Sequence, residues 1–380
     1  MKIVYVSDFL NHHQKPLADS FYHLLGKENF HYIATSQISE QRLNMGFPVL
    51  TASYAMNYTS LNKLEVDKLI DEADAVIIGA VPFSVMKRWY KKEKIIFHST
   101  ERLYKSISRY LKFPIHSCRS LIYKKGFILC SGAFVAKDFM LSGFPIQRCF
   151  RWGYFTEFRE YNSIERLITS KDGESVSGCI SILWAGRFLQ WKHPDAAICL
   201  AKRLRKDGIP FKLRMIGTGV LERRIKKQIE DDGLGDYVQL IGKMPPNDVR
   251  NYMEVSDIFI FTSDRFEGWG AVLNESMNSA CAVVASDMIG SVPYLIKDGE
   301  NGLIYKNGNN KILYQKVRSL IDNSEKRHKL QKSAYFTMRD EWSPKRAANN
   351  FVKLVEVVRQ GALSPFETGP CSMALPFHVK

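Results

Sequence analysis

Short apolar runs alternate with helix-length segments along the chain of 380 residues. Several of these runs are continuous, which is typical of strands that are buried on both faces of a parallel sheet. Strands that alternate with helices in this way predict an α/β fold with doubly wound parallel sheets. The expected strands are residues 2–7, 31–35, 75–79, 94–98, 127–131 and 147–152, followed by 180–185, 211–216, 238–241, 258–261 and 282–285.

The two series of strands predict two domains, because the chain is too long for one core of ordinary size. Residues 155–177 between the series are polar, contain Gly and Ser, and are expected to form a linker. We place the domains at residues 1–160 and 161–342. Residues 343–380 are expected to form a helix, with Ser343 as its cap and Pro344 in its first turn, and then an irregular tail.

The composition is that of a folded globular protein, with 45% hydrophobic and 24% charged residues. No stretch reaches about 18 uncharged apolar residues, so no membrane-spanning helix is expected. The first residues predict a strand and not a signal peptide. The seven cysteines include no Cys-x-x-Cys pair, which indicates free thiols in a reducing cytoplasm and no zinc site.

The net charge of +15 indicates an anionic partner, and by itself leaves nucleic acid, anionic lipid and a phosphorylated substrate open. Residues 102–125 contain seven Lys or Arg and no Asp or Glu, interleaved with aromatic and aliphatic side chains. Such a segment can lie on an anionic membrane surface. The alternative is a pair of surface helices with a core-facing stripe, interrupted at Pro114.

Candidate chemistry begins where the strand at 180–185 ends. Gly186 and Arg187 follow this strand, and Lys192 lies five residues beyond Arg187. A glycine permits close approach of the backbone, an arginine grips oxygen atoms in a fork and a lysine adds a point charge, which together suit a diphosphate. The alternative is a solvated loop that carries two ordinary surface cations.

Two more glycine-containing turns follow later strands. Gly217 and Gly219 follow the strand at 211–216 and form a partial dinucleotide fingerprint, although a plain tight turn has the same pattern. Glu267 lies in a turn flanked by glycines, and Glu275 lies on a helix that we expect to begin near Gly270. A carboxylate there can accept two hydrogen bonds from a vicinal diol such as a ribose. Two glutamates at this spacing also occur by chance, but all three turns follow carboxyl ends of strands, where open α/β sheets bind ligands.

Residues 180–305 resemble the donor-binding domain of the retaining GT-B glycosyltransferases, in particular glycosyltransferase family 4 (group 1). The resemblance implies two Rossmann-like domains that face each other across a cleft, with acceptor binding in residues 1–160, donor binding in 161–342 and a terminal helix that crosses back to the first domain. Ala280 and Ala282 depart from the family, which usually has Gly and Pro there. The motifs that carry the resemblance are Gly186-Arg187 with Lys192, Gly217-Thr218-Gly219, Glu267-Gly268-Trp269-Gly270 through Glu275, and Lys297-Asp298-Gly299-Glu300-Asn301-Gly302-Leu303.

The resemblance implies an enzyme that moves a sugar, with retention, from a UDP or GDP type of nucleotide sugar to a glycan or lipid-linked acceptor in cell-surface polysaccharide synthesis. Arg187 and Lys192 would bind the diphosphate and Glu267 the transferred sugar. Glu275 would hold the ribose, and the backbone from Gly268 through Trp269, Gly270 and Ala271 to Val272 would approach sugar and phosphate. We expect no cofactor and no metal, since the chain has no Asp-x-Asp motif. The expected location is the cytoplasm, at the periphery of the inner membrane face.

The N-terminal half departs further from this family. The loop Asn11-His12-His13-Gln14 stands where the family often has two glycines, and it could reach the diphosphate or the acceptor, although paired histidines in a loop are more often surface residues. His98 is the remaining candidate for a catalytic histidine, and a packed histidine at a strand end is the alternative.

Two other functions remain compatible with part of the pattern. A nucleotide-sugar epimerase of the same GT-B architecture would use the same donor site without transfer. A basic nucleic-acid-binding protein would explain the charge, but it would not explain paired glutamates, which repel phosphates. We therefore expect no nucleic-acid partner.

Overall fold

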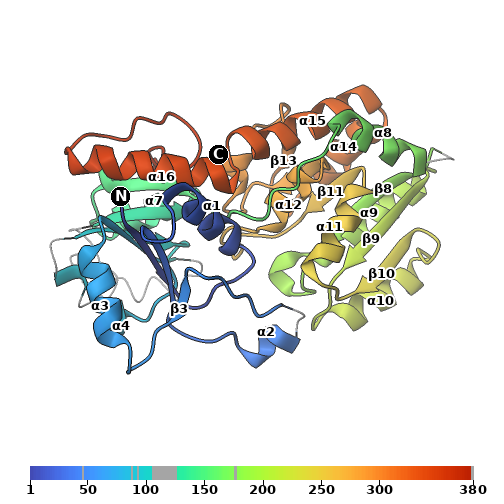
Figure 1. The fold of residues 1–380 in the computed structure, drawn as a ribbon. Helices are drawn as coiled ribbons and strands as arrows, with labels where there is room; N and C mark the ends of the chain where they lie inside the picture. The colour runs from blue at the N-terminus through green and yellow to red at the C-terminus, as the bar shows by residue number, and fades with distance from the viewer. Residues whose placement is uncertain (45–46, 87–88, 92–93, 105–125, 175–177, 378–380) are drawn as a thin grey trace. The chain divides into compact units, whose positions relative to one another are not determined.

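The computed structural model describes residues 1–44, 47–86, 89–91, 94–104, 126–174 and 178–377 (Figure 1). The chain forms two compact units, each built around its own sheet. Unit 1 contains Met1–Asn44, Pro48–Glu157 and Glu341–Lys380, and unit 2 consists mainly of Phe158–Asp340. The predicted α/β class with two doubly wound parallel sheets is confirmed. Within the described part of the chain, no helix is both long enough and apolar enough to cross a membrane.

The sheet of unit 1 has seven parallel strands in the order β3-β2-β1-β4-β5-β6-β7. The strand order reverses at β1, which is the position where open α/β sheets form a crevice. Strand β3 was not predicted, because its three residues are too few to form an apolar run and none of them is buried. The bounds are β1 Ile3–Ser7, β2 Phe30–Ala34, β3 Ala55–Asn57, β4 Ala75–Ile78, β5 Ile95–Thr100, β6 Phe127–Ser131 and β7 Cys149–Trp152.

Helices cover this sheet, and the last helix of the chain is one of them. Helix α16 (Pro344–Arg359) packs against α1 (Lys15–Leu25), and the Ser343 hydroxyl accepts a hydrogen bond from the Arg346 amide as its cap. The ring of Phe351 lies 4.7 Å from that of Phe97 and 5.6 Å from that of Phe21, measured between centroids. The other helical segments are α2 Glu40–Asn44, α3 Lys63–Glu72, α4 Phe83–Met86, α7 Val135–Leu141, and the 3-10 turns Trp89–Lys91 and Ile146–Arg148.

The tail after α16 is irregular but is not loose. The Arg151 amide donates to the Ser372 carbonyl at 2.7 Å, and the Ala374 amide donates to the Cys149 carbonyl at 2.9 Å. These bonds pair the tail with β7 at the end of the sheet order, so that backbone groups of the edge strand find partners. Ser372 and Ala374 are fully buried.

The sheet of unit 2 has six parallel strands in the order β10-β9-β8-β11-β12-β13, and its order reverses at β8. The core on its faces is apolar and buried, as the continuous runs in the sequence require. The strands are β8 Ile180–Ala185, β9 Phe211–Ile216, β10 Val238–Gly242, β11 Ile258–Phe261, β12 Ala282–Ser286 and β13 Leu303–Tyr305. The helices are α8 Ile164–Glu174, α9 Pro194–Lys206, α10 Glu222–Asp231, α11 Pro246–Glu254, α12 Val272–Asn278, α13 Val292–Leu295, α14 Asn310–Ile321 and α15 Ser324–Asp340, with a 3-10 turn at Gln190–Lys192.

Within the expected linker at residues 155–177, Ile164–Glu174 instead form helix α8. Helix α8 packs its Ile164 and Ile168 against Ala280 and Tyr335 in a small buried cluster of unit 2. Sequence alone failed here because α8 is polar on most of its surface. Only a few apolar positions mark its buried face.

A buried lysine joins α8 to the rest of unit 2. The Lys171 ammonium donates to the carbonyls of Ser256, Ser279 and Ala280 at 2.9, 2.8 and 2.8 Å, and to that of Met253 at 3.1 Å. These carbonyls lie at or just beyond the carboxyl ends of α11 and α12, where helix dipoles favour a cation. Burial lowers the pKa of Lys171. Ala280 adopts a positive φ of 51°, where the resembled family has a glycine.

We predict that Lys171→Met lowers the free energy of unfolding by about 3 kcal/mol, because buried carbonyls lose their donor and gain no water. The measurement is urea unfolding followed by circular dichroism. Lys332→Met is the matched control, since Lys332 is half exposed and its ion pair with Glu165 lies on the surface. Equal destabilisation by the two variants would contradict a structural role for the buried ammonium.

Candidate functional site

Three turns meet at the carboxyl edge of the sheet of unit 2. They follow β8, β9 and β11, and these strands are neighbours in the sheet. The Phe188 amide donates to the Thr218 carbonyl at 2.9 Å, and the Asp264 amide donates to the Trp191 carbonyl at 3.0 Å. The structure thus brings together the three motifs that are far apart in the sequence.

The glycines of the second turn allow it to approach the first. A Cβ atom at Gly217 would lie 2.0 Å from the Gly186 carbonyl oxygen, and Gly217 also has a φ of 128°. A Cβ atom at Gly219 would lie 2.6 Å from the Phe188 carbonyl oxygen. Any other residue would push the turns apart, so these glycines are needed for packing of the loops, whatever they bind.

An ion pair between Lys192 and Glu267 joins the first turn to the third. Both side chains are nearly buried, with 12% and 10% of their surface exposed. The Ser263 hydroxyl donates to the same carboxylate at 2.9 Å. The Lys192 ammonium also lies 4.6 Å from the ring centroid of Trp191, and the exposed guanidinium of Arg187 lies 5.9 Å from it. The predicted residues Arg187 and Lys192 therefore lie beside one aromatic side chain, and Glu267 is paired with Lys192.

The helix after the third turn begins near the predicted position. Helix α12 begins at Val272, two residues after Gly270, and Glu275 lies in its first turn. Glu275 is 7% exposed, and burial raises the pKa of its carboxyl group to about 7 against the opposing charges of Arg250 and Arg159.

The remaining residues of this turn are held by the core. Trp269 is fully buried, and its indole N–H donates to the Asn274 side chain at 2.8 Å. Gly270 has a φ of 85°, and a Cβ atom there would lie 2.5 Å from the Phe261 ring. Gly268 and Ala271 are buried, and Val272 is half-buried. Trp269 thus anchors the turn through its side chain.

His193 belongs to the same edge and was missed by sequence analysis. Its Nε2 lies 3.2 Å from the Asp264 carboxylate, and a hydrogen bond to Asp264 raises the pKa of His193. It adopts a positive φ of 49° directly before Pro194, which opens α9. The sequence offered one signal for His193, which is its position between Lys192 and Pro194. Its left-handed backbone conformation cannot be predicted from the neighbouring residue types alone.

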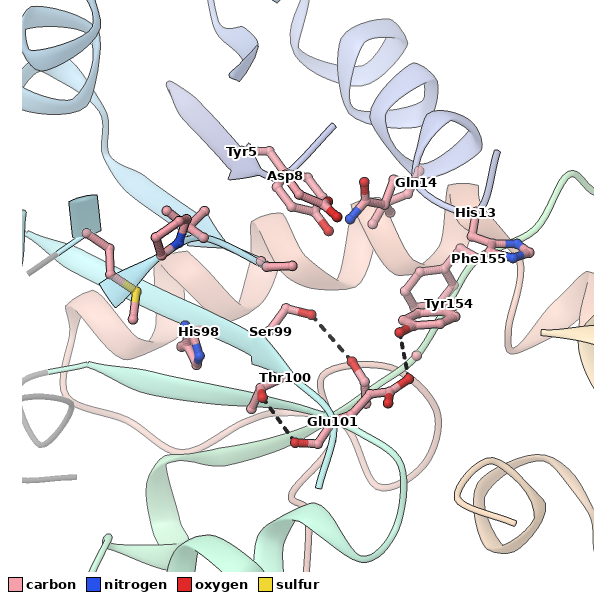
Figure 2. A pocket seen from close by; sticks show the side chains of 18 of the residues that line it. Tyr5, Asp8, His13, Gln14, His98, Ser99, Thr100, Glu101, Tyr154 and Phe155 are labelled. Atoms are coloured by element: carbon pink, nitrogen blue, oxygen red, sulfur yellow. Dashed lines mark hydrogen bonds between the residues drawn. The ribbon is translucent and has the colours of Figure 1, made fainter. Parts of the chain in front are cut away.

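Unit 1 contains a cavity of about 760 Å³ at the carboxyl edge of its sheet, next to the reversal at β1. Figure 2 shows Asp8, Gln14, Ser99 and Glu101 around this hollow, with the Tyr154 hydroxyl donating to the Glu101 carboxylate at 2.7 Å. Sequence analysis missed Asp8 and Glu101 as candidate site residues, although each directly follows the last residue of a strand.

The predicted loop of unit 1 contributes two of its four residues to this lining, His13 and Gln14. The Asn11 side chain accepts hydrogen bonds from the amides of both, at 3.0 and 3.1 Å, and so shapes the loop. The Gln14 side-chain amide donates a hydrogen bond to the Ser7 hydroxyl at 3.0 Å and accepts one from the Tyr32 hydroxyl at 2.6 Å. Burial and then the charge of Arg42 lower the pKa of His12 to about 4, so its imidazole is neutral at pH 7.

His98 lines the same cavity and is 9% exposed. Burial lowers its pKa to about 4. It is therefore both a packed residue at a strand end and a wall of the cavity, and the two interpretations do not exclude each other.

The basic segment 102–125 lies mostly outside the described residues, which end at Tyr104 and resume at 126. Its first residues pack within unit 1. The Arg102 guanidinium lies 4.9 Å from the Phe134 ring centroid and its Nε lies 3.6 Å from the buried Asp138 carboxylate. The membrane role of this segment stays a prediction.

Residues 169–336, which all belong to unit 2, match the family model described as glycosyl transferases group 1. An uncharacterized glycosyltransferase of Methanocaldococcus jannaschii is 28% identical over 183 residues, which cover 48% of this chain and 49% of that protein. The N-acetylgalactosamine-N,N'-diacetylbacillosaminyl-diphospho-undecaprenol 4-alpha-N-acetylgalactosaminyltransferase of Campylobacter jejuni is 32% identical over 146 residues, 38% of each chain. The chain thus aligns with half or less of the length of these relatives.

A solved structure resembles the whole fold. The crystal structure of Anabaena HepE in complex with UDP has a TM-score of 0.70, with 13% identity over 94% of this chain and 100% of that one. The fold is GT-B. The same protein has also been solved in complex with UDP-glucose. At this identity the likeness establishes the fold alone, and the matching stretch of unit 2 carries the sequence relation to group 1 glycosyl transferases.

His98 is buried in the wall of the unit 1 cavity, and this burial predicts how the free energy of unfolding depends on pH. Burial lowers the folded pKa of His98 from 6.5 to about 4, so on acidification the unfolded chain takes up the proton first. Its contribution to stability is complete above pH 6.5 and is lost as the pH falls towards 4, by about 2 kcal/mol between pH 7 and pH 5. His98→Gln should lose correspondingly less stability over this range.

The measurement is urea unfolding at the two pH values for wild type, His98→Gln and His23→Gln. His23 is an exposed histidine of α1 and serves as the control, so its variant should behave as the wild type does. If His98→Gln shows the same loss as the wild type, His98 is not kept neutral by the fold.

Proposed function

We propose that this protein is a glycosyltransferase that moves a sugar from a nucleotide-diphosphate sugar to a glycan or lipid-linked acceptor in cell-surface polysaccharide synthesis. The observation that carries the proposal is the gathering of Arg187, Lys192 and Glu267 at the carboxyl edge of the unit 2 sheet. The group 1 match of residues 169–336 and the UDP complexes of HepE support it. UDP is accordingly the first donor nucleotide to test, with GDP as the second.

The cations of unit 2 suit a departing diphosphate. Arg187 is exposed and can present its fork to phosphate oxygens, while Lys192 supplies a second positive charge from a nearly buried position. Negative charge grows on the diphosphate as the glycosidic bond breaks, and fixed cations stabilise that charge without reorganising. We propose that they do so without a metal.

Glu267 and Glu275 would hold the two sugars of the donor. The Glu267 carboxylate can accept hydrogen bonds from hydroxyls of the transferred sugar, and Glu275 from those of the ribose.

We propose retention of configuration, with the acceptor hydroxyl attacking on the face of the leaving group. The polar cavity of unit 1 offers hydroxyl, amide and carboxylate groups for such an acceptor. Attachment through residues 102–125 to the inner membrane face is part of the same proposal.

The experiment that tests this function begins with thermal unfolding in the presence of UDP, GDP and ADP sugars. The donor that stabilises the protein is then used with labelled sugar, with and without EDTA, and the product anomer is read by NMR. Transfer with a retained anomer that persists in EDTA is the expected result. Turnover that needs added magnesium or manganese contradicts the metal-free mechanism, and label that stays on the nucleotide as an altered sugar indicates an epimerase.

The ion pair predicts an unusual effect of one substitution. Glu267→Gln should bind UDP about fivefold more tightly, because a negative charge beside the diphosphate disappears and Lys192 loses its competing partner. Glu275→Gln should bind UDP more weakly, by about 1–3 kcal/mol, because a glutamine amide offers the ribose hydroxyls one acceptor oxygen where the carboxyl group offers two. Titration calorimetry measures both affinities.

Glu230→Gln is the matched control, since it removes one exposed acidic charge from α10 of the same unit. It should leave UDP binding unchanged. If Glu267→Gln weakens UDP binding, Glu267 acts by holding Lys192 in place and does not compete with the phosphate.

A further inference from the structure

Unit 1 has a second pocket, of about 420 Å³, beside the loops after β1 and β2 and the short strand β3. Its described lining consists mainly of apolar side chains, and the polar residues among them are uncharged. Val49 and Leu43 leave 67% and 41% of their surface in solvent. The apolar residues that matter most are Phe9, Leu10, Ile38, Leu43, Val49 and Met56. An open apolar hollow of this size is suited to a hydrocarbon ligand.

The apolar pocket adjoins the polar cavity described above. Ser36 lines both, and the neighbouring residues Asp8 and Phe9 line one each. The Ser36 amide and hydroxyl both donate to the Asp8 carbonyl, at 2.7 and 3.1 Å. One short stretch of backbone therefore forms the boundary between a polar and an apolar compartment.

A cation lies at this boundary. The Arg42 guanidinium lies 4.8 Å from the ring centroid of Phe9, which is a wall of the apolar pocket. Among the described residues no carboxylate forms an ion pair with Arg42. Burial is the main cause that lowers the pKa of His12 and of His13, the charge of Arg42 lowers both further, and His13 lines the polar cavity. Arg42 is thus near both compartments and has an exposed fork for an anion.

The polar cavity is a poor place for a phosphate. Its described lining includes two carboxylates, of Asp8 and Glu101, together with the hydroxyls of Ser99 and Tyr154 (Figure 2). Carboxylates and hydroxyls bind the hydroxyls of a sugar, whereas they repel or weakly hold a phosphate. The charge pattern separates a sugar side from a phosphate position at Arg42.

We infer that unit 1 binds an acceptor made of a hydrocarbon chain, a phosphate or diphosphate, and a sugar. The chain lies in the apolar pocket of Phe9 and Val49, the phosphate contacts Arg42 and the sugar enters the polar cavity. This assignment rests on the proposed transferase function and specifies its acceptor. It makes Arg42 a residue that binds the phosphate and Val49 a residue that contacts the hydrocarbon chain and gives specificity for it.

The test uses farnesyl diphosphate, geranyl diphosphate and inorganic pyrophosphate as probes, titrated by calorimetry into the full chain below their micelle concentrations. Excess UDP is present to occupy the cations of unit 2. Each methylene buried in the pocket should tighten binding about fourfold. Farnesyl diphosphate should therefore bind best, geranyl diphosphate less well and pyrophosphate least.

Four variants locate the binding. Arg42→Gln should weaken farnesyl diphosphate about tenfold and leave farnesol unchanged, while Arg42→Lys should restore most of the affinity. Val49→Asp should weaken both ligands. Arg224→Gln, at an exposed arginine of α10, is the matched control and should change neither. Circular dichroism checks that each variant is folded.

Two outcomes overturn the inference. The first is an affinity for pyrophosphate equal to that for farnesyl diphosphate, which would show that the pocket does not bind hydrocarbon. The second is an affinity of Arg42→Gln for farnesyl diphosphate equal to that of Arg224→Gln, which would show that Arg42 does not contact the phosphate. UDP binding measured in the same preparations tests the donor proposal separately, so a failure of one is not mistaken for a failure of the other.

Discussion

Everything chemical in this protein depends on one constraint, which is that neighbouring parallel strands end at the same edge of their sheet. Turns that are up to about eighty residues apart in the sequence meet in unit 2 because β8, β9 and β11 are adjacent and point the same way. Close packing of the turns then requires glycine at 217 and 219, where a Cβ atom would strike backbone oxygen. The polar groups are held in place by backbone packing before any ligand arrives.

The two sheet edges carry different charged groups. The edge of unit 2 presents Arg187 and Lys192, and the only described carboxylate paired with Lys192 is that of Glu267. The edge of unit 1 presents Asp8 and Glu101 with hydroxyl and amide groups, and burial keeps His98 neutral. Cations favour a diphosphate and carboxylates favour sugar hydroxyls, and this difference is the basis for proposing different ligands at the two edges.

Buried polar contacts fix the parts of unit 2 that carry the residues proposed to bind the donor. Lys171 satisfies carbonyls beyond the ends of α11 and α12, and α12 begins with the turn that contains Glu275. An ammonium in this position is costly to bury, and four backbone acceptors compensate for its lost water. The same contacts hold Ala280 in a left-handed conformation that a glycine would adopt without strain.

The sequence by itself determined the fold class and most strands, since an interior strand of a parallel sheet is a continuous apolar run. It also identified the residues at the unit 2 edge, because glycines, cations and acids after strands leave a local pattern. It did not reveal β3, α8 or Lys171, since their places depend on partners distant in the chain. Nor could it reveal the ion pair of Lys192 with Glu267 or the boundary of two pockets at Ser36. Such contacts join residues that share no local pattern, and only tertiary packing brings them within reach of each other.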